Sequence, residues 1–149
     1  MGAIRKAKTD DAARIAEMLV FNNRLYYFPI FRDEAYSFGR MQVPAVEREY
    51  LDPQALAQTF VFDDGGIVKG MIRIRAREIV KLYVEPSFQG QGIGAALLDF
   101  AVARHGADHL WALEKNTRAL AFYGRNGFRP TGERVAEEGT AEYLLRLAR

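Results

Sequence analysis

The chain has no cysteine and only two histidines among its 149 residues. Without a thiol it cannot form a disulfide, bind a metal through thiolates or use a cysteine nucleophile in catalysis. No apolar run approaches the length that crosses a bilayer, and residues 1–15 lack the apolar stretch of a secretory signal. These absences predict a cytoplasmic protein that has no membrane anchor and carries out no thiol chemistry.

A large excess of one charge is also missing, because 21 Lys and Arg stand against 19 Asp and Glu, for a formal net charge of +2. Neither this balance nor any segment of interleaved basic and aromatic residues supports nucleic-acid binding. With 49% hydrophobic residues, a chain of this length can bury one core, and no linker or internal repeat divides it. We therefore expect a single domain over residues 1–149.

Hydrophobic periodicity predicts a chain in which strands and helices are mixed. The predicted strands cover residues 3–8, 59–62, 67–75, 78–84, 109–113, 128–135 and 140–147. The predicted helices cover residues 10–22, 46–58, 93–105 and 116–126, the first capped by Thr9 or Asp10 and the last by Asn116. Residues 24–58 are otherwise irregular. This order predicts an α/β fold in which about four helices flank a mixed, mostly antiparallel sheet of about six to seven strands.

Three glycines at alternate positions stand between the predicted strand at 78–84 and the predicted helix at 93–105. Residues 89–95 read QGQGIGA. Glycine lets backbone N–H groups approach an anion without obstruction by a Cβ atom, and the positive end of the helix dipole favours a phosphate. The segment therefore predicts a phosphate or diphosphate site, although a tight connection that needs glycine only for its conformation has the same pattern.

Positions 90, 92 and 95 also fit the fingerprint of dinucleotide-binding folds, and Glu114 lies where a ribose-binding acid is expected. Such folds start with this motif and continue through further strand and helix units. Here the motif follows an antiparallel meander, and only residues 95–149 remain after it. An NAD-binding oxidoreductase is therefore the weaker interpretation, and the absence of a G-x-x-x-x-G-K-[ST] loop disfavours a nucleotide triphosphatase.

At these residues the sequence resembles the GNAT superfamily of N-acetyltransferases. The family signature, Q/R-x-x-G-x-G/A after a strand and at the start of a helix, is matched by Gln89, Gly92 and Gly94. The strand EIVKLYVEP at 78–86 and the segment NTRALAFYGRNGF at 116–128 resemble two further motifs of the family. The opening IRKA, followed by TDDA, also fits, so the resemblance covers most of the chain outside residues 24–58.

The resemblance implies that acetyl-coenzyme A binds with its diphosphate on the backbone of residues 89–94. Its pantetheine arm would follow the edge of strand 78–84, where that strand separates from strand 109–113. A strand edge beside a helix N-terminus offers partners both for the amides of pantetheine and for the phosphates. The implied cofactor-binding residues are Leu82, Tyr83, Val84, Gln89, Gly90, Gln91, Gly92, Ile93, Gly94, Ala95, Asn116 and Tyr123.

Catalytic roles are also implied by the resemblance. The amide of Leu82 would stabilise the oxyanion of the tetrahedral intermediate, and Tyr123 would protonate the leaving thiolate. An amine acceptor must first lose a proton, for which Glu78 is the first candidate base and Glu85 a weaker one. In a purely structural interpretation, Tyr123 is a core aromatic and Glu78 a solvated carboxylate at a strand end.

Residues 24–58, where enzymes of this family hold their acceptor, are rich in aromatics. Tyr26, Tyr27 and Tyr36 could line an acceptor pocket, although the aromatic residues of this segment could also simply cover the core. His105 and His109 have the spacing of a metal-binding pair, but Gly106 should end the helix between them, so we expect no metal. The acceptor would be an amine of a small molecule or a protein, and exposed strands could pair two copies into a homodimer.

The sequence thus predicts an N-acetyltransferase that moves the acetyl group of acetyl-coenzyme A to a primary amine by direct attack in a ternary complex. A protein that binds coenzyme A for regulation, without catalysis, is the main alternative. The two differ in whether acetyl-coenzyme A is turned over when amines are supplied.

Overall fold

The computed structural model describes residues 2–149 and has a seven-stranded sheet at its centre. The strands are β1 (Ala3–Lys6), β2 (Thr59–Asp64), β3 (Ile67–Arg75), β4 (Glu78–Val84), β5 (His109–Leu113), β6 (Arg129–Ala136) and β7 (Tyr143–Ala148). Their order across the sheet is β1-β2-β3-β4-β5-β7-β6, and every neighbouring pair is antiparallel except β4 and β5. This confirms the mixed, mostly antiparallel sheet predicted from the sequence.

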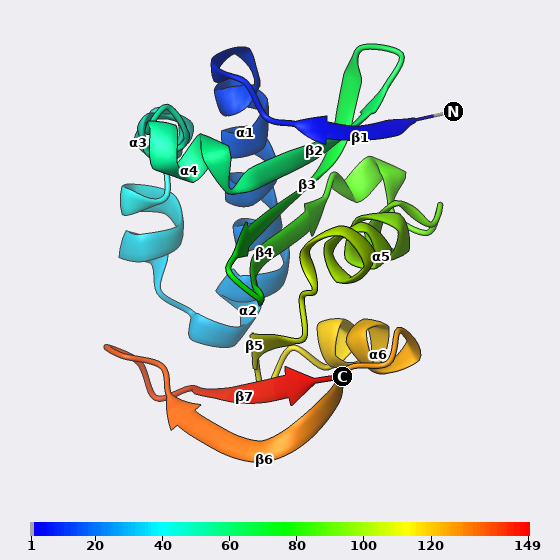
Figure 1. The fold of residues 1–149 in the computed structure, drawn as a ribbon. Coiled ribbons are helices and arrows are strands. Elements are labelled where there is room, and N and C mark those ends of the chain that lie inside the picture. The colour runs from blue at the N-terminus through cyan, green and yellow to red at the C-terminus, as the bar shows by residue number, and fades with distance from the viewer. Residues whose placement is uncertain (1) are drawn as a thin grey trace.

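Along residues 2–149, six α-helices lie on the two sides of the sheet (Figure 1). They are α1 (Ala12–Asn22), α2 (Phe28–Phe31), α3 (Val43–Tyr50), α4 (Pro53–Ala57), α5 (Ile93–His105) and α6 (Thr117–Arg125). Residues of α1, α3 and α4 pack with Met71 on one face, and residues of α5 pack with Ile72 on the other. Successive strand residues point to opposite faces, so these neighbours on β3 belong to different cores. None of the described helices is both long and apolar enough to cross a bilayer.

The segment between α1 and β2 is more helical than the sequence predicts. In place of one helix over 46–58, the structure has α3 and α4. The part predicted to be irregular contains α2 and π-helical turns at Asn23–Tyr27 and Ala35–Arg40. The prediction of a single helix is wrong because proline has no N–H to continue a helix and its ring clashes with the preceding turn. Pro53 instead begins α4, where the carboxylate of Asp52 accepts a hydrogen bond from the N–H of Ala55 at 3.1 Å.

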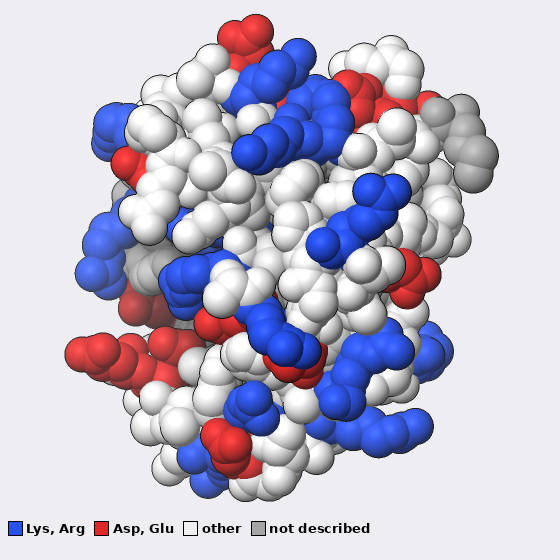
Figure 2. Space-filling view, viewed as in Figure 1, with Lys and Arg blue, Asp and Glu red and all other residues white. Residues whose placement is uncertain are grey.

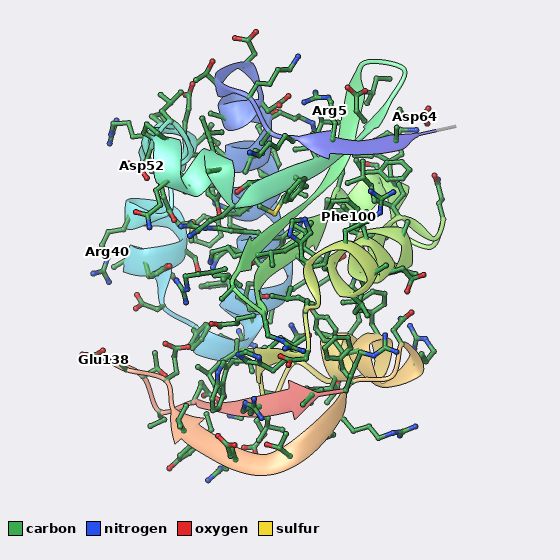
Figure 3. The ribbon with its side chains drawn as sticks, viewed as in Figure 1. Arg5, Arg40, Asp52, Asp64, Phe100 and Glu138 are labelled. Carbon is green, nitrogen blue, oxygen red and sulfur yellow. The ribbon has the colours of Figure 1, made fainter. Side chains whose placement is uncertain are left out.

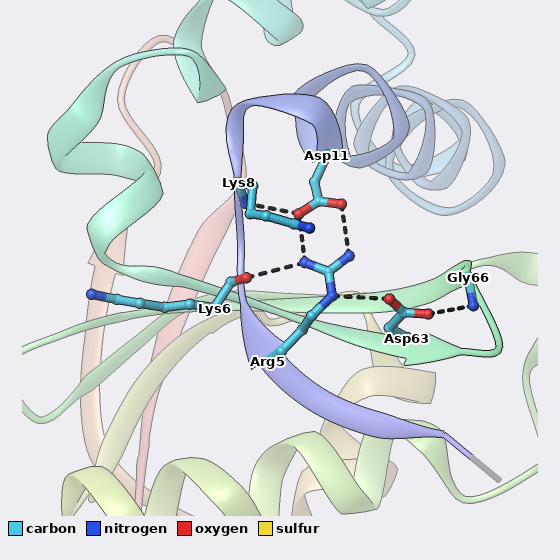
Figure 4. Close-up of polar contacts among 6 residues, drawn as sticks. All are labelled: Arg5, Lys6, Lys8, Asp11, Asp63 and Gly66. Atoms are coloured by element: carbon cyan, nitrogen blue, oxygen red, sulfur yellow. Dashed lines mark hydrogen bonds and ion pairs between the residues drawn. The ribbon is translucent and has the colours of Figure 1, made fainter.

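Arg5 joins β1 to the start of α1 and to the β2–β3 turn (Figure 4). Its guanidinium donates to the two carboxylate oxygens of Asp11, at 2.8 and 3.0 Å, and to Asp63 Oδ2 at 2.9 Å. Asp11 also accepts from the N–H of Lys8, and Asp63 from the N–H of Gly66, each at 2.8 Å. We call these five residues the Arg5 network, in which the charged groups are one another's partners.

The start of α1 is therefore held by Asp11, and not by Thr9 or Asp10 as predicted. Thr9–Asp11 form a 3₁₀ turn ahead of the helix, and the predicted caps make no capping hydrogen bond. Burial acts to raise the pKa of the Asp11 carboxyl, but hydrogen bonds from Arg5 and from the N–H of Lys8 outweigh it. The pKa of Asp11 consequently lies below its ordinary value.

β4 and β5 are paired at one end only. The paired positions are Glu78 with His109 and Ile79 with Leu110. Against β3, the register of β4 shifts so that Val80 is an extra residue with no position opposite it. Such a bulge bends the strand that carries it. Beyond Val80 the two parallel strands separate, and a cleft opens between them.

Candidate active site

A cleft of about 1300 Å³ opens where β4 and β5 separate. It is lined by these two strands, by the turn before α5, by α6, by parts of residues 19–41 and by the β6–β7 loop. The helical segment between α1 and β2 therefore belongs to this cleft, although the sequence did not define its structure.

The main-chain edge of β4 beyond the bulge faces the cleft. The N–H of Glu85 donates to the carbonyl of Lys69 on β3 at 2.9 Å, so Glu85 and, two residues earlier, Tyr83 pair with β3. Main-chain groups in an antiparallel strand alternate between its two sides. Those of Leu82 and Val84 therefore point away from β3, and the N–H of Leu82 is available to a ligand in the cleft.

The carbonyl of Val84 is already occupied by side chains. It accepts hydrogen bonds from Asn22 Nδ2 and from Gln89 Nε2, each at 3.2 Å. Asn22 Nδ2 also donates to the carbonyl of Met18 at 2.8 Å. These bonds hold the end of α1 and the glycine turn against the end of β4.

Gly90 and Gly92 give the turn before α5 its open backbone. Their φ angles of 79° and 84° lie in the left-handed region, and no atom lies within 4 Å of the position where either Cβ would be. No side chain caps α5, so its first N–H groups have no partner within the helix. Gly94 has a different role, because a Cβ there would lie 3.1 Å from the ring of Phe122 and would separate α5 from α6.

Gln89 links the glycine turn to both sides of the cleft. Its Oε1 accepts hydrogen bonds from the hydroxyl of Tyr26, at 3.1 Å, and from the guanidinium of Arg118. Arg118 also lies over the ring of Tyr26, with Cζ 4.1 Å from the ring centroid. Tyr26, which is predicted to bind the acceptor, and Gln89, which is predicted to bind the cofactor, are thus in direct contact.

Tyr123 lies in the wall of the cleft, on α6. Its ring packs edge to face against Phe122 and Phe128, with centroids 5.2 and 6.3 Å apart, and no residue of 2–149 hydrogen bonds to its hydroxyl. Burial, and then the neighbouring phenol of Tyr27, raise the pKa of Tyr123 above its ordinary value. The hydroxyl therefore stays protonated and can donate a proton to a group in the cleft.

The three tyrosines predicted to contact the acceptor all line the cleft. Tyr27 packs edge to face on Tyr83, with ring centroids 6.3 Å apart. Tyr36 is 39% exposed, and Arg40 lies over its ring at 5.5 Å. Tyr27 is therefore an inner residue of the cleft, whereas Tyr36 lies at its outer edge.

Three residues with a predicted site role do not line the cleft: Glu78, Glu85 and Gln91. Glu78 lies at the paired end of β4, and its carboxylate accepts a hydrogen bond from Arg75 at 3.2 Å. Glu85 accepts from Arg14 at 2.8 Å. The other predicted cofactor-binding residues, Asn116 among them, do line the cleft, and Asn116 caps α6 as predicted by accepting from the N–H of Ala119 at 3.2 Å.

Glu114, on which the dinucleotide interpretation rested, is held by Arg134. The guanidinium donates to both carboxylate oxygens, at 3.1 and 3.0 Å, and Glu114 does not line the cleft. The sheet contains one parallel pair, not the run of parallel strands of a dinucleotide fold.

The histidines also have structural partners. The ring of His105 lies 4.9 Å from that of Phe60 and 5.3 Å from that of Phe100, and His109 Nδ1 is 2.8 Å from Asp108 Oδ1. Nowhere in residues 2–149 do three His, Cys, Asp or Glu side chains gather as a metal ion would require.

Several polar residues without a predicted role also line the cleft, among them Asn23, Ser37, Lys81 and Glu137. Asn23 and Ser37 are buried, and Asn23 Oδ1 has no hydrogen-bond partner within the described chain. Lys81 could have been noticed, because it is the one charged residue within the apolar run IVKLYV. Nothing in the local sequence of Glu137 indicates that its loop reaches the cleft.

Comparison with known proteins agrees with this geometry. Residues 55–130 match the family model described as "Acetyltransferase (GNAT) domain". The peptidyl-lysine N-acetyltransferase YiaC of Escherichia coli is 32% identical over 93 residues, which cover 62% of this chain and 62% of YiaC. The match thus spans less than two thirds of that relative's length.

Solved structures share the fold over nearly the whole chain. Apo YjaB from Escherichia coli superposes with a TM-score of 0.80 at 20% identity, covering 99% of this chain and 97% of YjaB. The PaiA N-acetyltransferase from Thermoplasma acidophilum, solved in complex with coenzyme A, gives 0.75 at 18% identity, covering 100% and 99%. With the family match and the splayed β4–β5 cleft, these likenesses lead to one assignment: the chain belongs to the GNAT acetyltransferase family.

Proposed function

We propose that this protein transfers the acetyl group of acetyl-coenzyme A to a primary amine in a ternary complex. One observation carries the proposal: the free main-chain edge of β4 and the uncapped start of α5 meet in a single cleft. The coenzyme A complex of PaiA supports the cofactor, and the name of YiaC supports an amine acceptor. The chain has no cysteine to carry the acetyl group, which favours direct transfer.

In this proposal the cofactor lies along the cleft. Its diphosphate accepts hydrogen bonds from the free N–H groups between Gly90 and Ala95, at the positive end of α5. Its pantetheine amides pair with the main-chain groups of Leu82 and with the N–H of Val84, as an added strand would. Asn116 and Tyr123 face the cofactor from the other side of the cleft.

The reaction begins when the amine nitrogen attacks the thioester carbon. The carbonyl oxygen of the thioester becomes an oxyanion, to which the N–H of Leu82 donates a hydrogen bond. The C–S bond then breaks, and the leaving thiolate takes the proton of the Tyr123 hydroxyl. The nitrogen releases a proton, which returns to the tyrosinate through water, so the products are an N-acetyl amide and free coenzyme A.

The acceptor must also lose a proton before it attacks, because a lysine-like ammonium has a pKa of about 10.4. The carboxylates that line the cleft are Asp33, Glu137, Glu138 and Glu142. Asp33 and Glu142 are held in ion pairs, and Glu138 is exposed. Glu137 is half-buried and unpaired within residues 2–149, so we assign it the role of base in place of Glu78.

Calorimetry with acetyl-coenzyme A tests the cofactor site. Gly92→Val places a side chain on a left-handed residue in the turn and should raise the Kd about tenfold or more. Gly65→Val is the matched control, because Gly65 has a φ of 62° and open space around it but lies in the β2–β3 turn. Absence of saturable binding at millimolar acetyl-coenzyme A would overturn the proposal.

Release of free thiol with a panel of primary amines tests catalysis. We expect acetyl transfer that requires both substrates together, with Glu137→Gln lowering kcat/KM about 100-fold and Glu78→Gln having little effect. Binding of acetyl-coenzyme A without turnover on any amine would instead favour a regulatory coenzyme A-binding protein. An equal loss in the two glutamate variants would contradict the choice of Glu137.

A further inference from the structure

Lys81 is the one lysine among residues 2–149 that lines the cleft, and it has no partner. It forms no hydrogen bond and no ion pair within the described chain. Two lysines elsewhere in the chain do have partners: Lys69 lies 2.7 Å from Asp64, and Lys115 lies 3.1 Å from Glu142. An ammonium group that is taken partly out of water without a counterion is unfavourable.

The charged groups around Lys81 do not supply this counterion. Burial lowers the pKa of Lys81, Glu49 and Glu137 act in the opposite direction, and Arg73 lowers it further. Glu49 is paired with Arg73 at 3.4 Å, and its side chain is half exposed. Glu137 affects the ammonium only from beyond the distance of an ion pair. Lys81 thus faces the cleft as a cation that a bound anion could neutralise.

Asn23 provides a second unsatisfied group in the same cleft. Asn23 is 9% exposed, and its Oδ1 accepts no hydrogen bond within the described chain. A buried carbonyl oxygen without a donor is unfavourable, as is a buried cation without an anion. The cleft therefore lacks one hydrogen-bond donor at Asn23 and one negative charge at Lys81.

The β6–β7 hairpin adds acidic side chains at the mouth of this cleft. Figure 3 places Glu138 at the tip of the hairpin, and Figure 2 shows acidic side chains gathered on that side of the molecule. Glu137 and Glu138 both line the cleft. An acceptor would therefore meet acidic groups at the mouth and a cation on the β4 wall.

We propose that the acceptor is a small amino-carboxylate, a molecule that carries its reactive amine close to a carboxylate. Lys81 binds the carboxylate, while Asn23 Oδ1 and Glu137 receive the N–H groups of the ammonium. This proposal rests on the proposed acetyl transfer and narrows its substrate class. A lysine side chain in a peptide supplies only the amine of this pair, because that amine is far from any carboxylate of its own residue.

Matched acceptors separate these possibilities. We would measure kcat/KM for free amino acids, for the carboxamides of the same amino acids, and for an N-blocked lysine peptide. The full chain with saturating acetyl-coenzyme A would be used throughout. A carboxylate held by a charged hydrogen bond should favour the amino acid over its carboxamide by about 10- to 100-fold.

Two variants assign that preference to Lys81. Lys81→Met should remove most of the preference, because it raises KM for the amino acid far more than KM for the carboxamide. Lys81→Arg keeps the positive charge and should retain part of the preference. Because the lysine has no structural partner, Lys81→Met should unfold at the same or a higher denaturant concentration, so a misfolded variant can be recognised.

The outcomes distinguish this inference from the proposed function. If acetyl-coenzyme A does not bind at all, the proposed function fails and the acceptor class with it. If it binds, and the carboxamide or the peptide is acetylated as fast as the amino acid, the amino-carboxylate is wrong while acetyl transfer stands. Binding without acetylation of any amino acid would also overturn the inference, as would a preference that persists in Lys81→Met.

Discussion

The Arg5 network and the cleft are both clusters of polar side chains, yet they differ in how those side chains are satisfied. In the network, Arg5 has carboxylate partners at 2.8 to 3.0 Å, and those carboxylates accept backbone N–H groups as well. In the cleft, Lys81 has no partner and Asn23 Oδ1 accepts no hydrogen bond.

This difference separates structural polar groups from functional ones. Satisfied charges join three parts of the chain and contribute to stability, whereas unsatisfied groups in an open cleft have their partners on a ligand. Substitutions in the network should therefore reduce stability, and substitutions in the cleft should reduce binding or turnover while leaving stability intact.

The largest effect on stability is expected for Asp11→Ala. It leaves Arg5 and the N–H of Lys8 without their shared partner, so the free energy of unfolding should fall by about 2 to 4 kcal/mol. Urea denaturation measures this change. Asp10→Ala is the matched control, because Asp10 is exposed and should change stability by less than about 0.5 kcal/mol. Equal losses of stability in Asp11→Ala and Asp10→Ala would show that the Arg5 network has no structural role.

The largest effect on catalysis is expected for Tyr123→Phe. It deletes the hydroxyl that we propose as the proton donor, and it should lower kcat by about 100-fold, which corresponds to about 2.7 kcal/mol. Because no residue of the described chain hydrogen bonds to the hydroxyl, the urea midpoint should hardly change. Single-turnover measurements establish that chemistry limits the rate. An unchanged kcat under those conditions would assign the proton to water.

Acid should weaken the Arg5 network. The pKa of Asp11 is lower in the folded chain than in the unfolded chain, so its contribution is present above the unfolded pKa. That contribution is lost as the pH falls through the folded pKa. Urea denaturation at several pH values should show stability falling in acid for the native sequence and falling less for Asp11→Asn. Parallel curves for the two proteins would contradict this.

The smallest effect on stability is expected for Asn23→Leu. The substitution removes an unsatisfied carbonyl oxygen, so stability should stay within about 1 kcal/mol of the native value or rise. The KM for the acceptor should increase, because its ammonium loses a hydrogen-bond partner. Asn22→Leu provides the contrast, since it breaks bonds to Met18 and Val84 and should destabilise the chain. A larger loss of stability at Asn23 than at Asn22 would show that Asn23 has a structural role.

Local patterns in the sequence were enough to predict most of the fold. Strand-like runs between turn residues identified all seven strands, and helical periodicity identified α1, α5 and α6. Asn116 was correctly predicted as a cap because its bond to Ala119 is local. The helices around Pro53 were predicted poorly, since tertiary packing decides how a segment with several prolines and aromatics is arranged.

The glycine turn and the tyrosines of the cleft could also be chosen from the sequence, because their residue types are informative where they stand. Glu78 could not be judged in that way. Whether a carboxylate at the start of a strand faces a cleft or an arginine depends on where β4 separates from β5, and that point is set by the bulge at Val80.

By itself, the amino-acid sequence determined the order of strands and helices and the presence of a glycine turn ahead of α5, because both depend on neighbours along the chain. The tertiary structure alone decided which charges find partners. In the sequence, Asp63 and Lys81 are each simply a charged residue, but folding brings Arg5 to the Asp63 carboxylate and leaves the Lys81 ammonium facing a cleft. The physical reason is that electrostatic satisfaction depends on distances between segments that lie far apart in the sequence.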